Sequence, residues 1–106
     1  MFELIFHPEA EEEILSLESK MQAKALAALD KLEVQGNHLR YPDTDTIQDG
    51  LFELRVGKKD ITRTFFAFAK EKRIYILRTF VKKTAKTPKN EIKLAIKRLE
   101  ELTNEN

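Results

Sequence analysis

The sequence has no cysteine and no long apolar run, and these two absences exclude several classes of protein. Without cysteine there is no disulfide and no thiolate site. The absence fits a reducing compartment, so we expect a cytoplasmic protein. No apolar run approaches the ~18 residues of a membrane-spanning helix. The acidic start MFELIFHPEAEEE is also unlike a signal peptide, so we expect no membrane association.

Histidine is scarce as well. His7 precedes a proline and His38 lies in a loop-like stretch, far away in the sequence. Two separated histidines, without cysteines or clustered carboxylates, make a poor metal site. We therefore predict no metal and no cofactor, and we assign neither histidine to catalysis.

The net charge of +1 hides a strong asymmetry along the chain. Residues 1–19 hold six glutamates and no basic residue, whereas residues 55–89 hold twelve basic and two acidic residues. Positive charge gathered into one third of a near-neutral chain favours a polyanion partner. The alternative is that lysines in hairpin turns only prevent the pairing of sheet edges.

The first half of the chain reads as a strand followed by two helices. Alternating apolar residues predict a strand over Phe2–Phe6. Pro8 suits the first position of a helix whose early glutamates favour its positive end. A second apolar stripe predicts a helix from about Lys20, ended by Gly36. The turn-forming stretch from Asn37 to Gly50 is interpreted as a loop.

The second half reads as three strands and a helix. The strand-like runs are Leu51–Val56, Asp60–Ala69 and Arg73–Val81, separated by GKKD and KEK. Short turns between such runs predict an antiparallel meander. The last helix begins at TPKNE, with Thr87 as the predicted cap. We see no repeat and no second domain, so residues 1–106 are interpreted as one α+β domain.

The alternation of side chains along the strands places three charged residues on one face. Glu53 and Arg55 share a face of the first run, and Arg63 takes the same face of the next. A turn at Lys58–Asp60 would bring Arg55 almost opposite Arg63. Like charges opposite each other are unfavourable in a sheet. The pair therefore needs an anion, the Glu53 carboxylate, or release into water, and simple neutralisation by Glu53 on a wet face is an open alternative.

The stretch FVKKTAKTPKNE follows the last predicted strand and adds more positive charge. Lys82 and Lys83 are expected to meet Arg63 and Arg55 at one rim of the sheet. Phe80 and Phe65 can offer planes for stacked nucleobases, although core packing explains Phe65 better. The candidate RNA-binding set is Lys58, Lys59, Arg78, Phe80, Lys86 and Lys89.

The segments GLFELR, Arg63 with Phe65, and FVKKTAKTP, taken together, resemble the RelE superfamily of bacterial toxins. The resemblance is greatest to its phage-derived HigB-like branch and covers nearly the whole chain. It departs from that branch where Phe52 replaces a common tryptophan and where no histidine lies in the pocket region.

This resemblance implies a RelE-like α+β fold: a curved antiparallel sheet with an N-terminal strand, a three-stranded meander, two N-terminal helices and one C-terminal helix. It implies the toxin of a type II toxin–antitoxin system, a hydrolase that cuts translated mRNA at the ribosome and inhibits growth. It also implies a small helix-turn-helix, HigA-like antitoxin that silences the toxin in a complex of higher oligomeric state.

The resemblance carries catalytic roles to Arg55, Arg63, Lys82 and Lys83, with Glu53 beside them. Metal-free cleavage uses the 2′-OH as nucleophile, and we expect Arg63 to stabilise the phosphate charge with Arg55 in support. A lysine acts as a base only in its neutral form, which adjacent cations and desolvation favour. Glu53 is a possible base but better suited to orient Arg55. The alternatives are a non-catalytic RNA- or DNA-binding module and an inactive homologue kept for antitoxin binding.

Overall fold

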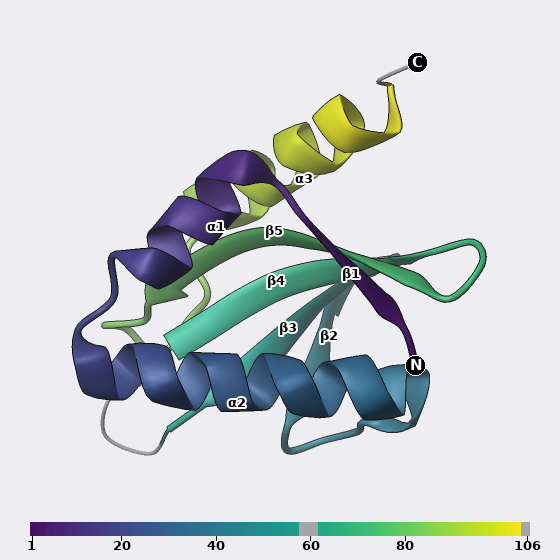
Figure 1. The fold of residues 1–106 in the computed structure, drawn as a ribbon. Coiled ribbons are helices and arrows are strands. Elements are labelled where there is room, and N and C mark those ends of the chain that lie inside the picture. The colour runs from purple at the N-terminus through teal and green to yellow at the C-terminus, as the bar shows by residue number, and fades with distance from the viewer. Residues whose placement is uncertain (58–61, 105–106) are drawn as a thin grey trace.

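A curved sheet with helices packed on both faces organises the chain (Figure 1). The structure, a computed structural model, describes residues 1–57 and 62–104. The elements within these ranges are β1 (Glu3–Phe6), α1 (Pro8–Leu15), α2 (Ser19–Gln35), the short 3-10 turn η1 (Gly36–His38), β2 (Thr44–Gln48), β3 (Leu51–Val56), β4 (Thr62–Ala69), β5 (Arg73–Val81) and α3 (Lys89–Thr103). The predicted α+β class, the curved sheet and the placement of the helices are confirmed.

The order of the strands is β1-β5-β4-β3-β2. The three predicted strands of the meander pair antiparallel, as expected from their short turns. β1 joins the free edge of β5 in a parallel pair, with Glu3 opposite Arg73. The sheet is therefore mostly, and not wholly, antiparallel.

β2 is an element that the sequence analysis missed. Residues 37–50 were expected to form a loop, but Thr44–Gln48 pair antiparallel with β3, with Thr44 opposite Leu54 and Thr46 opposite Phe52. The segment TDTIQ has weak strand character, so its conformation depends on the neighbouring strand more than on its own propensity. The start of α3 also differs by one residue, because Pro88 and not Thr87 occupies the cap position.

Two apolar clusters fill the space between the sheet and the helices. On one face, Leu29 and Leu32 of α2 pack near Leu54, Phe66 and Ile76 of the sheet. On the other face, the apolar side of α3 covers Phe65 and Leu77. None of the helices in the two described ranges is long and apolar enough to cross a membrane.

A buried ionic cluster fastens α1, β5 and α3 together. Arg98 of α3 donates to both carboxylate oxygens of Glu13 in α1, at 2.9 and 2.8 Å, and also to the Leu77 carbonyl. Glu13 in turn accepts the backbone N–H of Thr79 at 3.1 Å. This bond satisfies the edge of β5 beyond the point where β1 ends, so α1 continues the edge protection that β1 begins.

The charge of Glu13 is stabilised by these contacts. Burial alone raises the pKa of Glu13, but the hydrogen bonds from Arg98 and Thr79 and the charges of Arg78 and Arg98 outweigh it and lower the pKa below its usual value. A carboxyl group with a lowered folded-state pKa stabilises the fold above its unfolded-state pKa. That stabilisation is lost as the pH falls through the folded-state pKa.

We predict that Glu13→Gln lowers the free energy of unfolding at pH 7 by about 2–4 kcal/mol, because it neutralises the carboxylate that pairs with both Arg98 and Arg78 and leaves buried Arg98 with Glu9 as its remaining carboxylate partner. The variant should also lose less stability than the wild type on acidification below the ordinary carboxyl pKa. Urea unfolding at pH 7 and at about pH 3.5 measures both effects. Glu11→Gln, on the exposed side of the same helix, is the control. Equal pH dependence in the Glu13→Gln and Glu11→Gln variants would contradict this role.

Candidate nucleic-acid interface

The pairing of β3 with β4 places Arg55 directly opposite Arg63. The next strand continues the row, because Phe80 of β5 is the partner of Arg63 on the other side. The predicted opposition of the two arginines is therefore confirmed. Partners opposite each other point to the same face of a sheet, so this row lies on the face that α3 covers farther along the strands.

A buried carboxylate lies beside the two arginines. Glu53 Oε1 is 3.5 Å from Arg63 Nε, and Glu53 Oε2 is 4.0 Å from Arg55 Nε. Neither Glu53 Oε1 nor Arg63 Nε has a hydrogen-bond partner among the described residues. Among the described residues, one negative charge thus faces two positive charges, so neutralisation by Glu53, the alternative that the sequence left open, is incomplete. The nearer partner of Glu53 is Arg63 and not Arg55, the partner that the sequence analysis preferred.

The two arginines differ in access to solvent. The side chain of Arg63 is 5% exposed, whereas that of Arg55 is 32% exposed. Burial lowers the pKa of Arg63; Glu53 opposes this effect and the like charge of Arg55 adds to it. An arginine remains charged under such conditions. Arg63 is therefore a buried cation, and its Nη1 donates a hydrogen bond to the Thr62 carbonyl at 3.3 Å.

The exposed side of Arg55 carries a contact that the sequence analysis did not predict. The guanidinium carbon of Arg55 lies 5.4 Å from the centre of the Tyr41 ring. Tyr41 belongs to the turn before β2 and is 70% exposed. The sequence analysis did not predict β2, so nothing in the sequence indicated that this turn lies next to β3.

The predicted lysines follow at the same end of the sheet. Val81, the last residue of β5, is paired with Thr62, the first residue of β4. Lys82 and Lys83 come next, the first half-buried and the second exposed. Figure 1 shows β3 ending and β4 beginning at the end of the sheet where β5 leads into the segment before α3. Lys86 lies in that segment and Lys89 is the first residue of α3, and both are exposed. Lys58 and Lys59 lie outside the described residues.

Arg78, which the sequence analysis placed in the RNA-binding set, pairs with carboxylates of the protein itself. Its Nε and Nη2 atoms donate to the two carboxylate oxygens of Glu91 at 2.7 and 3.1 Å, and its Nη1 donates to Glu13. The hydrogen bonds to Glu91, against the effect of burial, raise the pKa of Arg78 and fix its charge inside the protein. Arg78 is a structural residue of the ionic cluster.

Phe80 is also less accessible than expected. It is only 8% exposed and packs edge-to-face on the fully buried Phe65, with ring centres 5.2 Å apart. Both rings belong to the apolar cluster under α3. Core packing therefore explains both rings in this structure, and stacking of a nucleobase on Phe80 would require Phe80 to become exposed.

The two histidines lie in separate elements of the chain's N-terminal half, one at the start of α1 and the other in η1. His7 Nδ1 accepts the Glu9 N–H at 3.2 Å, which caps the start of α1. Nε2 is then the protonated nitrogen and donates to Glu101 at 2.7 Å. His38 is exposed in η1. In residues 1–57 and 62–104, no three His, Asp or Glu side chains are grouped to hold a metal ion.

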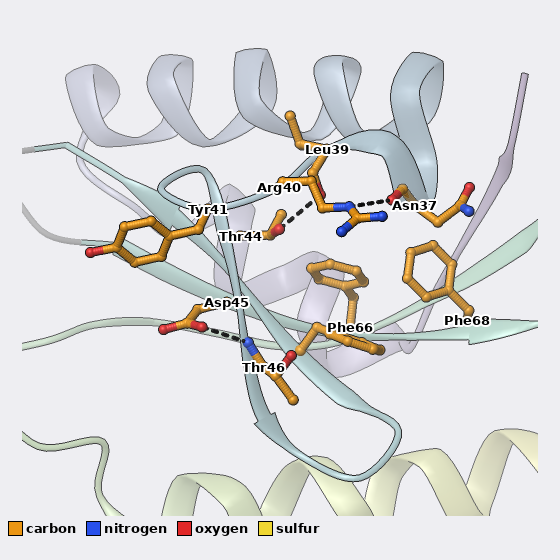
Figure 2. A pocket seen from close by; sticks show the side chains of 10 residues that line it. Asn37, Leu39, Arg40, Tyr41, Thr44, Asp45, Thr46, Phe66 and Phe68 are labelled. Carbon is orange, nitrogen blue, oxygen red and sulfur yellow. Dashed lines mark hydrogen bonds between the residues drawn. The ribbon is translucent and has the colours of Figure 1, made fainter.

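A cleft of about 430 Å³ lies on the opposite face, between the C-terminal end of α2 and β2 (Figure 2). Its floor is aromatic, with Phe52 and Phe66 stacked at 5.6 Å between ring centres. Phe52 and Phe66 alternate with Glu53 and Phe65 along their strands, so the cleft opens away from the arginine pair. Tyr41 lies at one end of the cleft and points away from Phe66 and Phe68 (Figure 2). The remaining lining residues are Asn37, Leu39, Arg40, Thr44, Asp45 and Thr46.

The profile of the phage-derived Gp49-like protein family (DUF891) matches residues 12–100. The chain belongs to this family. The matched range contains Arg55, Arg63, Lys82 and Lys83, all of α2 and most of α3. The family is associated with RelE-like and toxin-like proteins. The phage-derived part of the predicted resemblance is thus confirmed. No curated protein matches the chain.

We predict that Glu53→Gln lowers the free energy of unfolding by about 1–3 kcal/mol, because it leaves Arg55 and Arg63 opposite each other without a counter-charge. Inorganic phosphate should restore more stability to this variant than to the wild type, since it can supply the missing anion. Urea unfolding with and without phosphate at constant ionic strength measures the difference. Asp30→Asn is the control, because Asp30 is an exposed carboxylate on α2, away from the arginine pair. Identical phosphate responses in the two variants would refute the anion-binding property of the pair.

Proposed function

We propose that this protein is the toxin component of a type II toxin–antitoxin system and cuts mRNA without a metal ion, acting on messages that are being translated. The observation that carries the proposal is the Arg55–Arg63 pair, partly neutralised by Glu53, at the end of the sheet where Lys82 and Lys83 begin. Membership of a family associated with RelE-like and toxin-like proteins supports the same proposal.

The proposed reaction is attack of the ribose 2′-OH on the adjacent phosphorus. The bond from phosphorus to the 5′ oxygen of the next nucleotide breaks. The products are a 2′,3′-cyclic phosphate and a 5′-OH. The protein must remove the proton of the 2′-OH, stabilise the charge that develops on the phosphate, and protonate the leaving 5′ oxygen.

We assign the contact with phosphate to Arg55 and a supporting role to the buried Arg63. The sequence analysis gave Arg63 the first role, but its side chain is 5% exposed and that of Arg55 is 32% exposed. The planar fork of an arginine matches two phosphate oxygens. Arg63 adds positive potential from the buried side. Glu53 keeps this charge in place until the phosphate of the substrate supplies a second anion.

Lys82 and Lys83 are the proposed source of the proton-transferring groups. Both follow β5 directly, at the rim that also carries the start of β4. Lys82 is half-buried and Lys83 is exposed. We propose that one of these two lysines, in its neutral form, accepts the proton of the 2′-OH, and that the other, in its charged form, donates a proton to the leaving 5′ oxygen.

The proposed partner is a small helix-turn-helix antitoxin, HigA-like, that binds the toxin in a complex of higher oligomeric state. An antitoxin that covers the arginine pair would silence the enzyme by occupying the site of the RNA. The proposal thus predicts that antitoxin and RNA exclude each other. If the chain forms this complex but cuts no RNA, it is an inactive homologue. If it binds RNA or DNA with strong salt dependence and leaves it intact, it is a binding module.

The test of this proposal is the mapping of mRNA 5′ ends in a translating bacterial extract, with and without the purified protein. A parallel sample contains an inhibitor of translation. We expect new ends only in the translating sample. New ends in both samples would mean a free ribonuclease. If the folded protein produces no new ends, the endonuclease proposal is wrong.

We predict that Arg55→Ala lowers the rate of cleavage by about 100-fold or more, the loss typical for one group that stabilises transition-state charge. Arg55 is only half-buried, so the fold should survive the change. Arg55→Lys should restore part of the rate, because it keeps the charge and loses the fork. Lys93→Ala, an exposed cation on α3, is the control. A cleavage rate of Arg55→Ala within threefold of the Lys93→Ala control would sink the assignment.

A further inference from the structure

Tyr41 presents a large aromatic surface to solvent at the edge of the arginine pair. Its residue is 70% exposed, although phenol rings usually bury much of their surface. Among the described residues, the other exposed aromatic side chain is Phe68, near the far end of β4, and it packs on Phe52 and Phe66. A ring left this accessible next to paired cations calls for a binding explanation.

The backbone fixes the position of Tyr41. The Asp43 and Thr44 N–H groups both donate to the Arg40 carbonyl, at 3.0 and 3.3 Å, which closes the turn around Tyr41. The Arg55 N–H donates to the Asp43 carbonyl at 2.8 Å, which fastens this turn to β3. Tyr41 is therefore held beside Arg55 by main-chain bonds, and its side chain is not needed to maintain the turn.

The Arg55 guanidinium lies over one face of the Tyr41 ring, and Tyr41 remains 70% exposed. The Arg55 guanidinium carbon is 5.4 Å from the Tyr41 ring centre, within the range of a cation–π contact. Arg55, Arg63 and Phe80 follow each other across neighbouring strands, so Tyr41 extends this row at the end away from Phe80. Phe80 is buried, and Tyr41 therefore offers the accessible aromatic surface of the row.

We propose that Tyr41 is a binding residue for a nucleobase of single-stranded RNA, the base of a nucleotide that adjoins the phosphate held by Arg55. This inference rests on the proposed function and names the part of the substrate that lies beyond the phosphate. Base stacking on an aromatic ring adds affinity for any base. Purines present the larger stacking surface, so the site should favour a purine at one fixed position from the cut.

The test compares cleavage maps of the wild type, Tyr41→Ala and Tyr41→Phe in the translating extract. Loss of one stacked base by alanine substitution weakens binding by about 5-fold to 100-fold. We expect Tyr41→Ala to lose cleavage efficiency at subsaturating mRNA by that factor, and Tyr41→Phe to stay within about twofold of the wild type, since it keeps the ring. Val34→Ala, an exposed apolar residue near the end of α2, is the matched control.

The base preference provides a readout that a merely structural role would not change. The Tyr41→Ala variant should cut at the same phosphates but should no longer prefer a purine over a pyrimidine at the affected position. If the wild type and Tyr41→Ala share both rate and base preference, this inference is overturned and the endonuclease proposal stands. If Tyr41→Phe is as slow as Tyr41→Ala, the hydroxyl and not the stacking surface matters, and the stacking inference is wrong. If the wild type makes no new ends, the proposed function fails, and this inference fails with it.

Discussion

The proposed site depends on one cross-strand arrangement: two arginines lie directly opposite each other in a sheet, and in the described part of the chain one buried carboxylate lies beside them. Opposed like charges destabilise a sheet, and one glutamate cannot neutralise two guanidinium groups. Glu53 Oε1 and Arg63 Nε, 3.5 Å apart, have no hydrogen-bond partners within the described parts of the chain. This arrangement lowers the stability of the folded state locally, and an anionic ligand bound between the arginines would restore it. Such costs tend to occur at functional sites.

The ionic cluster around Glu13 supports this arrangement from the other side of β5. Arg98 and Arg78 are cations too, but carboxylates of α1 and α3 pair with them at hydrogen-bond distance, although Arg98 Nε has no hydrogen-bond partner among the described residues. They hold both helices against the sheet and seal the edge of β5. Arg98 and Arg78 therefore stabilise the fold, whereas Arg55 and Arg63, which share the Glu53 carboxylate, form the proposed site.

Much of the arginine site follows from the sequence, because it depends on local rules. The runs LFELRV and TRTFFAFA are separated in the sequence by GKKDI alone, and side chains alternate between the two faces of a strand, so both the face and the approximate register of Arg55 and Arg63 can be predicted. Arg78 looked equivalent to them in the sequence. Its partners are Glu91 of α3 and Glu13 of α1, which is 65 residues away, and only the packing of these two helices on the sheet reveals the contacts.

β2 and Tyr41 could not be predicted for a related reason. TDTIQ gains its strand conformation from pairing with β3, and this pairing brings the turn that contains Tyr41 to the edge of the site. Phe80 shows the opposite error. Its place next to the lysines suggested a stacking surface, but the apolar side of α3 shares its cluster and buries it.

The chemistry of the cut ends tests the central claim most directly, because it separates attack by the 2′-OH from every hydrolysis in which water attacks the phosphorus. The measurement determines the chemical groups at the two RNA ends produced at one mapped cleavage site. It is made on the ordinary mRNA and on the same mRNA with a single 2′-deoxy nucleotide before the scissile phosphate. The account predicts a 2′,3′-cyclic phosphate and a 5′-OH on the first, and no cut at that site on the second. A 3′-OH with a 5′-phosphate, or unchanged cleavage of the 2′-deoxy message, would contradict it.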